Sequence, residues 1–451
     1  MDQSTRPLEG LKVVELSIAI AAPSCGRSLA YFGADVMKIE SLQYPDVVRL
    51  FGSAWARTPE YASVFTDTSP YLSEMNANKR SVGLNLKVAA AVQAAKKLIA
   101  QADVFLTNYS TPAVTDLGLA AATLRALNPR LIYAALPAFG SDPELPYYSF
   151  ISWGPNQAPL VGLDAVTGFA DQEPAGVASF APPDYFAAMH GLVALLTALE
   201  EREHTGVGTS IDLSQFSTTV AALGPYLLDE QLSGTVVQRS GNRSAWYAPQ
   251  GVYPSRGEDR WVALTVTDDR GWQALAAMLD RAGPAATGGD TGFAGDAALG
   301  SVAGRHTHHD RLDAALTAWT TQRSAAQAAT ELQAAGIAAY PLNDTEAMLV
   351  DPQLSEYQWY KAVPCFRFPN GDLVGGSALN LEDTPGHWHR AFPTLGEHTV
   401  ECLATVAGLS DQEIADLIEQ GAAFVPTEPD LKLKRPYEHV LGLLGLKGQR
   451  R

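Results

Sequence analysis

Short apolar runs alternate with amphipathic helical patterns over the first third of the chain. The strand-like runs cover residues 11–16, 35–39, 81–86, 104–106 and 131–136, and the helical patterns cover residues 23–32, 88–100 and 119–127. Strands that are apolar on both faces and are joined by helices are typical of a parallel sheet with helices on both sides. The pattern therefore predicts an α/β fold built on a mainly parallel sheet.

A long segment without periodicity follows at residues 139–183, and it is rich in Gly, Pro, Ser and Trp. Such a loop inside a compact domain is usually functional. The helical pattern at residues 185–203 comes next and stops before Gly206, which suits a helix end. A strand at 210–213 and a helix at 216–232 complete this part of the chain.

A change in composition marks residues 234–250 as a linker. The block at 251–343 contains three strand patterns and three helical patterns, which predicts a smaller α+β domain. These are strands at 251–253, 261–266 and 337–341, and helices at 272–279, 309–319 and 324–335. Residues 344–451 hold a polar connection, a strand candidate at 362–368 and helices at 400–407 and 411–420.

The charge balance narrows the classes of partner. The 451 residues include 32 Lys and Arg against 49 Asp and Glu, a net charge of −17. A surface this acidic repels nucleic-acid phosphates and anionic lipid, so neither nucleic acid nor a membrane is an expected partner. Three widely spaced cysteines and no secretory signal or membrane-length apolar stretch predict a cytoplasmic protein.

Several well-known catalytic motifs are missing. The chain has no GxSxG, GxxxxGK[ST] or HExxH, and no GxGxxG follows the first strand, so hydride transfer and P-loop chemistry lose support. His306, His308, His309 and Asp310 lie close together, but a polar cluster at the start of a helix is typical of capping. No metal site is predicted.

Asp184 has two interpretations that use the same geometry. Pro182 and Pro183 fix the backbone before it, and a long apolar helix begins after it. The aspartate can be an N-cap. Alternatively, the free N–H groups and the positive end of the helix dipole keep its carboxylate ionised, as a nucleophile that forms an acyl anhydride.

Two further positions are open to both a structural and a functional interpretation. Lys79 and Arg80 are two adjacent cations in an acidic chain. They either form a solvated turn or provide the local positive charge that binds a phosphate. The turn at residues 18–23 joins the first strand to a helix, and it is either a tight connection or a seat for an anion.

Taken together, these residues resemble the class III coenzyme A transferases over nearly the whole chain. The order and spacing of the matching segments carry the resemblance. They are residues 7–16 (PLEGLKVVEL), 32–40 (FGADVMKIE), 78–87 (NKRSVGLNLK), 102–104 (ADV), 127–133 (LNPRLIY), 205–208 (TGVG) and 395–399 (LGEHT).

The resemblance implies a Rossmann-like large domain without a dinucleotide fingerprint, made of residues 1–233 and 344–451, and an interlocked dimer, either a homodimer or a heteromer. It implies that Asp184 is catalytic and forms an aspartyl anhydride and then an aspartyl-CoA thioester. The substrates are an acyl-CoA donor and a carboxylic acid acceptor, with no tightly bound cofactor.

The resemblance also carries a set of coenzyme A contacts onto this chain. They fall on Ile20, Ala21, Leu84, Lys87, Asn108 and Tyr109. Two basic positions common in the family are Ser41 and Asp116 here, so the phosphates would depend on Lys79, Arg80 or Lys87 instead.

Two other functions remain as alternatives. The first third resembles an α-methylacyl-CoA racemase equally well, but the expected Gly-His-Asp segment is replaced by residues 145–149 (LPYYS), and no histidine precedes His190. The second alternative is a non-catalytic subunit of a heteromeric transferase, against which the retained Asp184 argues. Residues 153–156 (WGPN) resemble the branch that uses succinyl-CoA with larger, often aromatic or alicyclic acids.

Overall fold

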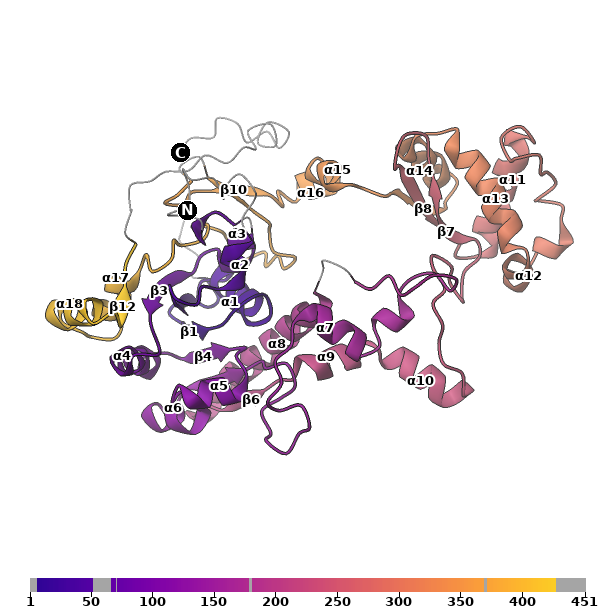
Figure 1. The fold of residues 1–451 in the computed structure, drawn as a ribbon. Helices are drawn as coiled ribbons and strands as arrows, with labels where there is room; N and C mark the ends of the chain where they lie inside the picture. Colours follow the sequence, from indigo (N-terminus) through magenta and orange to yellow (C-terminus); the bar gives the residue numbers. More distant parts are fainter. Residues whose placement is uncertain (1–5, 52–65, 70, 178–180, 369–370, 427–451) are drawn as a thin grey trace. The chain divides into compact units, whose positions relative to one another are not determined.

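The computed structural model describes residues 6–51, 66–69, 71–177, 181–368 and 371–426 (Figure 1). The chain forms two compact units. Unit 1 comprises residues 1–163, 177–235 and 349–451, and unit 2 comprises residues 164–176 and 236–348. The grouping of residues 164–176 with unit 2 is a feature that the sequence patterns do not indicate, because this segment follows the large domain's strands directly along the chain.

A seven-stranded sheet organises unit 1. Its order is β12 (Ala423–Phe424), β3 (Arg80–Leu84), β2 (Asp35–Glu40), β1 (Lys12–Leu16), β4 (Val104–Thr107), β5 (Ile132–Ala135) and β6 (Ser210–Asp212). All neighbours are parallel except β12, which pairs antiparallel with β3. The predicted parallel α/β fold is confirmed.

Helices cover both faces of this sheet because successive side chains of each strand point to opposite sides. Val14 belongs to a core with α4 (Ala89–Ala100), α6 (Ala121–Leu127), α17 (Thr399–Thr405) and α18 (Asp411–Glu419). Its neighbour Val13 belongs to the opposite core, with α1 (Ala21–Tyr31) and α8 (Pro182–Thr205). This arrangement is the reason that the strands carry apolar side chains on both faces.

The strand order creates a switch point between β1 and β4. The chain runs outward from β1 through β2 and β3 on one side, and through β4, β5 and β6 on the other. The loops after β1 and β4 therefore diverge at the carboxyl edge of the sheet, which is where open α/β sheets bind their ligands. The segment after β4 leads into α5 (Thr111–Asp116).

Two helices differ from the patterns in the sequence. The helix α8 begins at Pro182, so Asp184 is its third residue and Ala181 is the N-cap; the N-cap interpretation of Asp184 is wrong. Proline is well tolerated in a first turn because the N–H groups there have no partner within the helix. The expected helix at 216–232 is divided into α9 (Gln215–Ala222) and α10 (Gly224–Ser233).

The segment before α8 and the C-terminal third add short elements to unit 1. The long loop contains α7 (Gly154–Leu160), and η3 (Asp164–Val166) begins the part that belongs to unit 2. The strand expected at 362–368 is shorter in the structure: it covers only Lys361–Val363, and it pairs antiparallel with a second short strand. The remaining elements are α2 (Val47–Leu50), α3 (Tyr71–Asn76), α15 (Thr345–Leu349), α16 (Pro352–Glu356), β10 (Lys361–Val363) and β11 (Asp372–Val374).

Unit 2 is a three-stranded antiparallel sheet with helices, as the α+β pattern predicts. The strands are β7 (Gln250–Pro254), β8 (Trp261–Thr265) and β9 (Ala338–Pro341). The core includes Trp272 and Trp319. The helices are α11 (Asp269–Ala282), α12 (Val302–Thr307), α13 (His309–Thr321) and α14 (Ala325–Ala334), with the short turn η4 (Ala297–Leu299).

The polar cluster around residues 306–310 takes part in ion pairs and helix ends. Arg243 donates to both Asp310 and Asp313. Among the described residues, no group of three His, Cys, Asp or Glu side chains is arranged to hold a metal ion. No helix in the same residues combines the length and the apolar character needed to cross a membrane.

Candidate active site

Asp184 is a buried carboxylate in the first turn of α8. Its residue is only 7% exposed. Burial raises its pKa from 3.8 to about 6, although the backbone N–H of Ala21 and its own backbone N–H both act in the opposite direction. Ala21 is the first residue of α1, which packs against α8. The carboxylate thus faces the N-terminal turns of two helices and has no lysine or arginine among the causes of its pKa shift.

A close approach of α7 shapes the other side of this carboxylate. A Cβ atom placed on Gly154, the first residue of α7, would lie 2.7 Å from Asp184 Oδ2 and 2.6 Å from Ala181 Cβ. Both distances are too short for real contacts, so only glycine lets α7 pack this closely against the start of α8. The backbone of α7 therefore forms one wall around Asp184.

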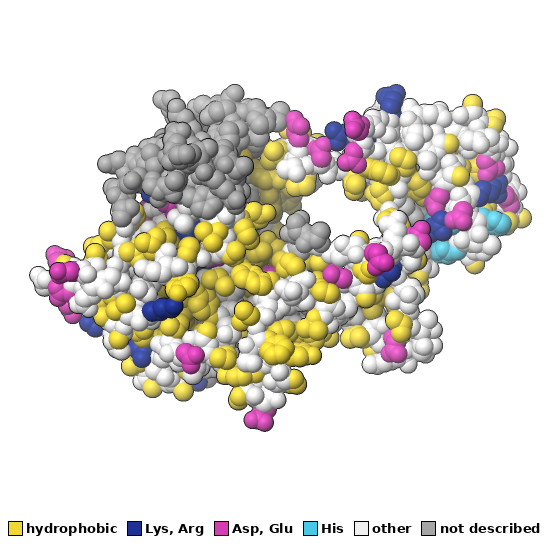
Figure 2. All heavy atoms as spheres, viewed as in Figure 1, with side chains coloured by type: hydrophobic (Ala, Val, Ile, Leu, Met, Phe, Trp, Pro, Cys, Tyr) yellow, Lys and Arg dark blue, Asp and Glu magenta, His cyan; other side chains and the backbone are white. Residues whose placement is uncertain are grey.

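Asp184 lines a cavity of about 220 Å³ at the switch point of the sheet. Its walls come from the loops after β1, β4 and β5, from the segment before α7, and from the start of α9. The residues lining it with Asp184 are Ile18, Ala19, Asn108, Tyr109, Ser110, Ala113, Ala138, Phe150, Ile151, Ser152, Trp153 and Gln215. Figure 2 shows apolar side chains gathered over α8 and the loop before α7.

Side chains from distant segments fix the loop after β1. Asn108 Oδ1 accepts from the Ile18 N–H at 3.0 Å, and Asn108 Nδ2 donates to the Ile18 carbonyl at 2.8 Å. Asp46 Oδ1 accepts from the Ala19 N–H at 2.8 Å. Ala19 has a φ of +58°, a conformation that a non-glycine residue keeps only where its surroundings impose it. These contacts set the direction of the backbone that leads to Ala21.

Asp46 also belongs to a set of buried charges below this loop, which we call the buried ion network: Glu15, Lys38, Glu40, Asp46, Arg49, Asp67 and Lys79. Lys38 Nζ lies 2.7 Å from Asp46 Oδ2 and 3.5 Å from Glu15 Oε1, and Lys79 Nζ lies 2.8 Å from Glu15 Oε2. Burial lowers the pKa of Lys79 to about 8, even though Glu15 opposes this effect.

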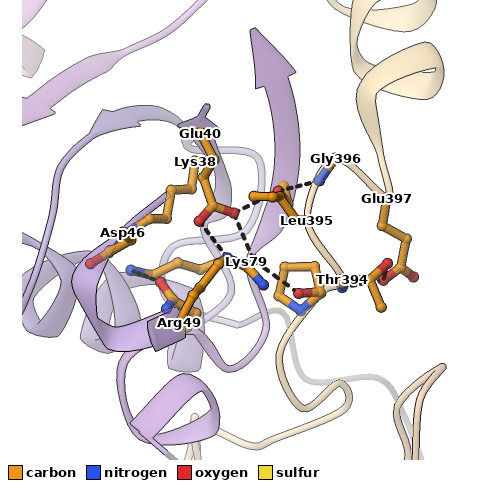
Figure 3. Close-up of polar contacts among 12 residues, drawn as sticks. Lys38, Glu40, Asp46, Arg49, Lys79, Thr394, Leu395, Gly396 and Glu397 are labelled. Carbon is orange, nitrogen blue, oxygen red and sulfur yellow. Dashed lines mark hydrogen bonds and ion pairs between the residues drawn. The ribbon is translucent and has the colours of Figure 1, made fainter. Parts of the chain in front are cut away.

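The other half of the network holds the C-terminal segment against the N-terminal part of unit 1 (Figure 3). Arg49 lies 2.7 Å from Glu40 and 3.0 Å from Asp67, and it donates to the Pro393 carbonyl at 3.1 Å. Burial would raise the pKa of Glu40, but the Arg49 charge and its hydrogen bonds lower it to about 2. The Gly396 N–H donates to Ser81 Oγ, whose hydroxyl donates to Glu40.

The structure corrects the expected role of two cations. Lys79 is fully buried and donates to Glu15 and to the Pro23 carbonyl, so it cannot reach a phosphate. Arg80 pairs with Asp35 and Glu401. The carboxylates that hold these two side chains lie on other strands and helices, far away in the sequence. Lys87 is exposed, and its Nζ donates to the Tyr44 hydroxyl and lies 4.2 Å from the centre of the Tyr44 ring. Of the three cations, it is the one that is paired with no carboxylate among the described residues.

The predicted contact residues fall into two groups. Asn108 and Tyr109 line the cavity beside Asp184, and Ile20 and Ala21 stand at the start of α1, directly after the lining residue Ala19. Burial raises the pKa of Tyr109 to about 12. Leu84 and Lys87 do not line this cavity; Leu84 is at the end of β3 with its side chain in the apolar core.

Gln215, Asp46 and Gly154 are among the residues that shape the site and that the sequence analysis does not predict. Gln215 Nε2 donates to the Leu136 carbonyl at 2.7 Å, and its Oε1 accepts from Gln157 at 3.2 Å. Asp46 precedes a helix and has the residue type of an N-cap, which was a usable signal. Gly154 carried only the weak signal of a Trp-Gly-Pro sequence. Nothing local distinguishes Gln215 from an ordinary surface glutamine.

The fold and the site define an α/β protein with a carboxylate-centred cavity at the switch point of a parallel sheet that lacks a dinucleotide fingerprint. Comparison with known proteins is more specific. The chain belongs to CoA-transferase family III, whose family model matches residues 8–399.

Relatives and a solved structure agree with this assignment. The chain is 28% identical over 415 residues to the succinyl-CoA–L-malate CoA-transferase beta subunit of Chloroflexus aurantiacus, covering 92% of this chain and 97% of that protein. It is 27% identical over 429 residues to a probable CoA-transferase of Mycobacterium tuberculosis, covering 93% of this chain but only 51% of that protein. The crystal structure of a CAIB/BAIF family protein from Brucella suis is 26% identical, with a TM-score of 0.77 over 89% of this chain and all of that one.

Proposed function

We propose that this protein transfers coenzyme A between carboxylic acids and that Asp184 is its nucleophile. The observation that carries the proposal is the position of Asp184: a buried carboxylate, next to the Ala21 N–H, on the wall of a cavity at the switch point. Membership of CoA-transferase family III supports the reaction class.

The proposed reaction balances without a cofactor. An Asp184 oxygen attacks the carbonyl carbon of the donor acyl-CoA, and the CoA thiolate leaves, which gives a mixed anhydride. The thiolate then attacks the aspartyl carbonyl, forms an aspartyl-CoA thioester and releases the donor acid. The acceptor carboxylate attacks this thioester and expels the thiolate, and the thiolate finally takes the acceptor acyl group and restores Asp184.

The environment of Asp184 suits this role. A pKa of about 6 leaves most of the carboxylate ionised at neutral pH while making it a stronger nucleophile than an exposed aspartate. The Ala21 N–H is placed to stabilise negative charge on the reacting oxygens. We expect kcat/KM to fall as the pH is lowered through about 6, because protonation of Asp184 removes the nucleophile.

We further propose that coenzyme A reaches the cavity along the residues of the predicted set. Ile20, Ala21, Asn108 and Tyr109 surround the thiol end of the route, and the exposed Lys87 is the candidate for its anionic end. Leu84 lies three residues before Lys87, with its side chain in the core, so its part is to hold β3 in place.

Two observations argue against the alternatives. A racemase needs a base beside its acid, but the described residues that line the cavity include no histidine, and the exposed His190 lies with Nδ1 2.8 Å from the Phe186 carbonyl of its own helix. A non-catalytic subunit has no need for a buried carboxylate, whose ionisation costs stability.

We also propose that the protein works as a dimer, of two copies or with a related chain. Unusually many apolar side chains are exposed on two helices of unit 1: Met189, Val193 and Leu196 on α8, and Tyr226, Leu227, Leu228 and Leu232 on α10. Patches of this kind are typical of interfaces. Native mass spectrometry of the purified chain tests the first form: a dimer supports two copies, and a monomer would contradict the homodimer and leave only the pairing with a related chain.

Trapping of the intermediate tests the transferase proposal. The protein is incubated with a panel of acyl-CoA thioesters and hydroxylamine, and peptide mass spectrometry should find an aspartyl hydroxamate at Asp184. Asp184→Asn should lower the exchange rate by about 10⁴-fold or more. The matched control is Asp411→Asn, at an exposed helix start, which should exchange at the normal rate. Exchange that persists in Asp184→Asn would contradict the proposal.

A further inference from the structure

The wall of the cavity around Asp184 is apolar and carries no positive charge. Asp184 is the one charged side chain among the described lining residues, which include no lysine, arginine or histidine. Phe150, Ile151 and Trp153 form the apolar side, and all three are partly exposed, Ile151 as much as 78%. An acyl group in this cavity therefore meets carbon surface rather than a cation.

The two amide side chains that face the cavity are already engaged. Both ends of the Asn108 amide bind the Ile18 backbone, and the Gln215 amide binds Leu136 and Gln157. The charge of Lys38 acts on the Tyr109 hydroxyl from outside the cavity lining. Lys38 is buried, is paired with Asp46 and Glu15, and does not line the cavity.

We infer, on the basis of the proposed function, that the acyl group handled at this site is an apolar monocarboxylic acid the size of a ring or a branched chain, and that dicarboxylic acids are poor substrates. An apolar cavity of about 150 Å³ accommodates benzene. The cavity here measures about 220 Å³, which leaves room for a six-membered ring with its carboxyl group beside Asp184.

The charge argument applies to the far end of the acid rather than to the reacting carboxylate. When the acceptor attacks, Asp184 is an uncharged thioester, so the attacking carboxylate meets no repulsion from it. A second carboxylate at the far end would lose part of its hydration against Phe150, Ile151 and Trp153 without a cation among the described lining residues to pair with. When Asp184 is released, this second carboxylate would also repel it.

Self-exchange measures this preference without knowledge of the natural donor. Each deuterated acid is incubated with its own unlabelled mono-CoA thioester, and the label that enters the thioester is followed by mass spectrometry. Cyclohexanecarboxylate and trans-cyclohexane-1,4-dicarboxylate form a matched pair that differs only in the second carboxylate. We expect kcat/KM for the monocarboxylate to be at least 100-fold higher, and exchange to be lost in Asp184→Asn.

A cation placed in the wall should reverse part of the preference. Ser152 lines the cavity, and Ser152→Arg should reduce the ratio between the two acids by at least 10-fold, because the guanidinium can pair with the second carboxylate. The control is Ser355→Arg, an exposed position on α16 that should leave the ratio unchanged.

The outcomes separate this inference from the proposed function. Faster exchange of the monocarboxylate, with a ratio that changes only in Ser152→Arg, supports the inference. Equal or faster exchange of the dicarboxylate that still depends on Asp184 overturns the inference and leaves the transferase function standing. Exchange of neither acid, nor of succinate or phenylacetate with their own thioesters, overturns the proposed function and this inference with it.

Discussion

Unit 1 buries acidic side chains in two regions that differ in their partners. Glu15 lies in the buried ion network, fully buried, with the ammonium groups of Lys38 and Lys79 within 3.5 Å and 2.8 Å. Asp184 lies on the cavity wall, almost as deeply buried, but the groups that stabilise its charge are backbone N–H groups. The two carboxylates are therefore buried to a similar extent, but only the charge of Glu15 is balanced by nearby cations.

This difference distinguishes a carboxylate with a structural role, Glu15, from one that is suited to a reaction, Asp184. A buried carboxylate with two ammonium groups beside it holds these neighbours in place. A buried carboxylate without a cation has a raised pKa and keeps a reactive oxygen, which is typical of functional sites. The same comparison explains why Lys79, a candidate phosphate contact by residue type, is part of the framework instead.

The largest effect expected from the comparison is the loss of the Glu15 charge. Glu15→Gln leaves Lys38 and Lys79 partly unpaired in the interior, and we expect the free energy of unfolding to fall by about 3–5 kcal/mol at pH 7. Urea denaturation measures it. Glu200→Gln, which breaks an exposed pair with His204, should change stability by less than about 1 kcal/mol. Equal effects of the two variants would contradict the structural role.

The opposite sign is expected at Asp184. Its pKa is about 6 in the folded chain against 3.8 ordinarily, so the folded state is destabilised by the ionised form at pH values above about 6. At 1.36 kcal/mol per pKa unit, Asp184→Asn should stabilise the fold by up to about 3 kcal/mol at pH 7. The gain should decrease from pH 6 to pH 4 and be absent below pH 4. Thermal or urea unfolding over this pH range measures it, and a loss of stability at pH 7 would contradict it.

The close contact between α7 and α8 gives a smaller effect. Gly154→Ala places a Cβ within 2.7 Å of Asp184 Oδ2, so the two helices must separate, at a cost of about 1–3 kcal/mol in stability. We also expect kcat to fall at least 10-fold as Asp184 is displaced. Gly295→Ala, where a Cβ meets open space, is the matched control in both measurements. Normal kcat in Gly154→Ala would show that the contact does not position the carboxylate.

The smallest effect links the two regions. Asp46 joins the network through Lys38 and holds the Ala19 N–H in the loop that leads to Ala21. Asp46→Ala should let the loop shift, so that the Ala21 N–H forms a weaker hydrogen bond with Asp184. Because this N–H lowers the pKa of Asp184, the acidic midpoint of the pH profile of kcat/KM should rise by about 0.5 pH units. Asp46→Asn keeps the acceptor oxygen and should restore the midpoint. An unchanged midpoint in Asp46→Ala would limit Asp46 to a structural role.

The amino-acid sequence by itself determined the strands, most helices and the candidacy of Asp184. These features depend on local patterns: period-two and period-3.6 burial, and a carboxylate placed between two prolines and a long helix. The sequence did not reveal that Asp184 lies inside the first turn of α8, or that Gly154 makes room for it.

Only the tertiary structure decided which charges are paired and which cavity they surround. Lys79 and Glu15 are 64 positions apart, and Asp46 and Ala19 are 27 apart. Such contacts depend on the order β3-β2-β1-β4, which brings the loops after β1 and β4 together. A local sequence pattern indicates which residues are buried and whether burial repeats with the period of a strand or of a helix. The free energy of a buried charge, however, depends on partners that the fold brings from distant parts of the chain.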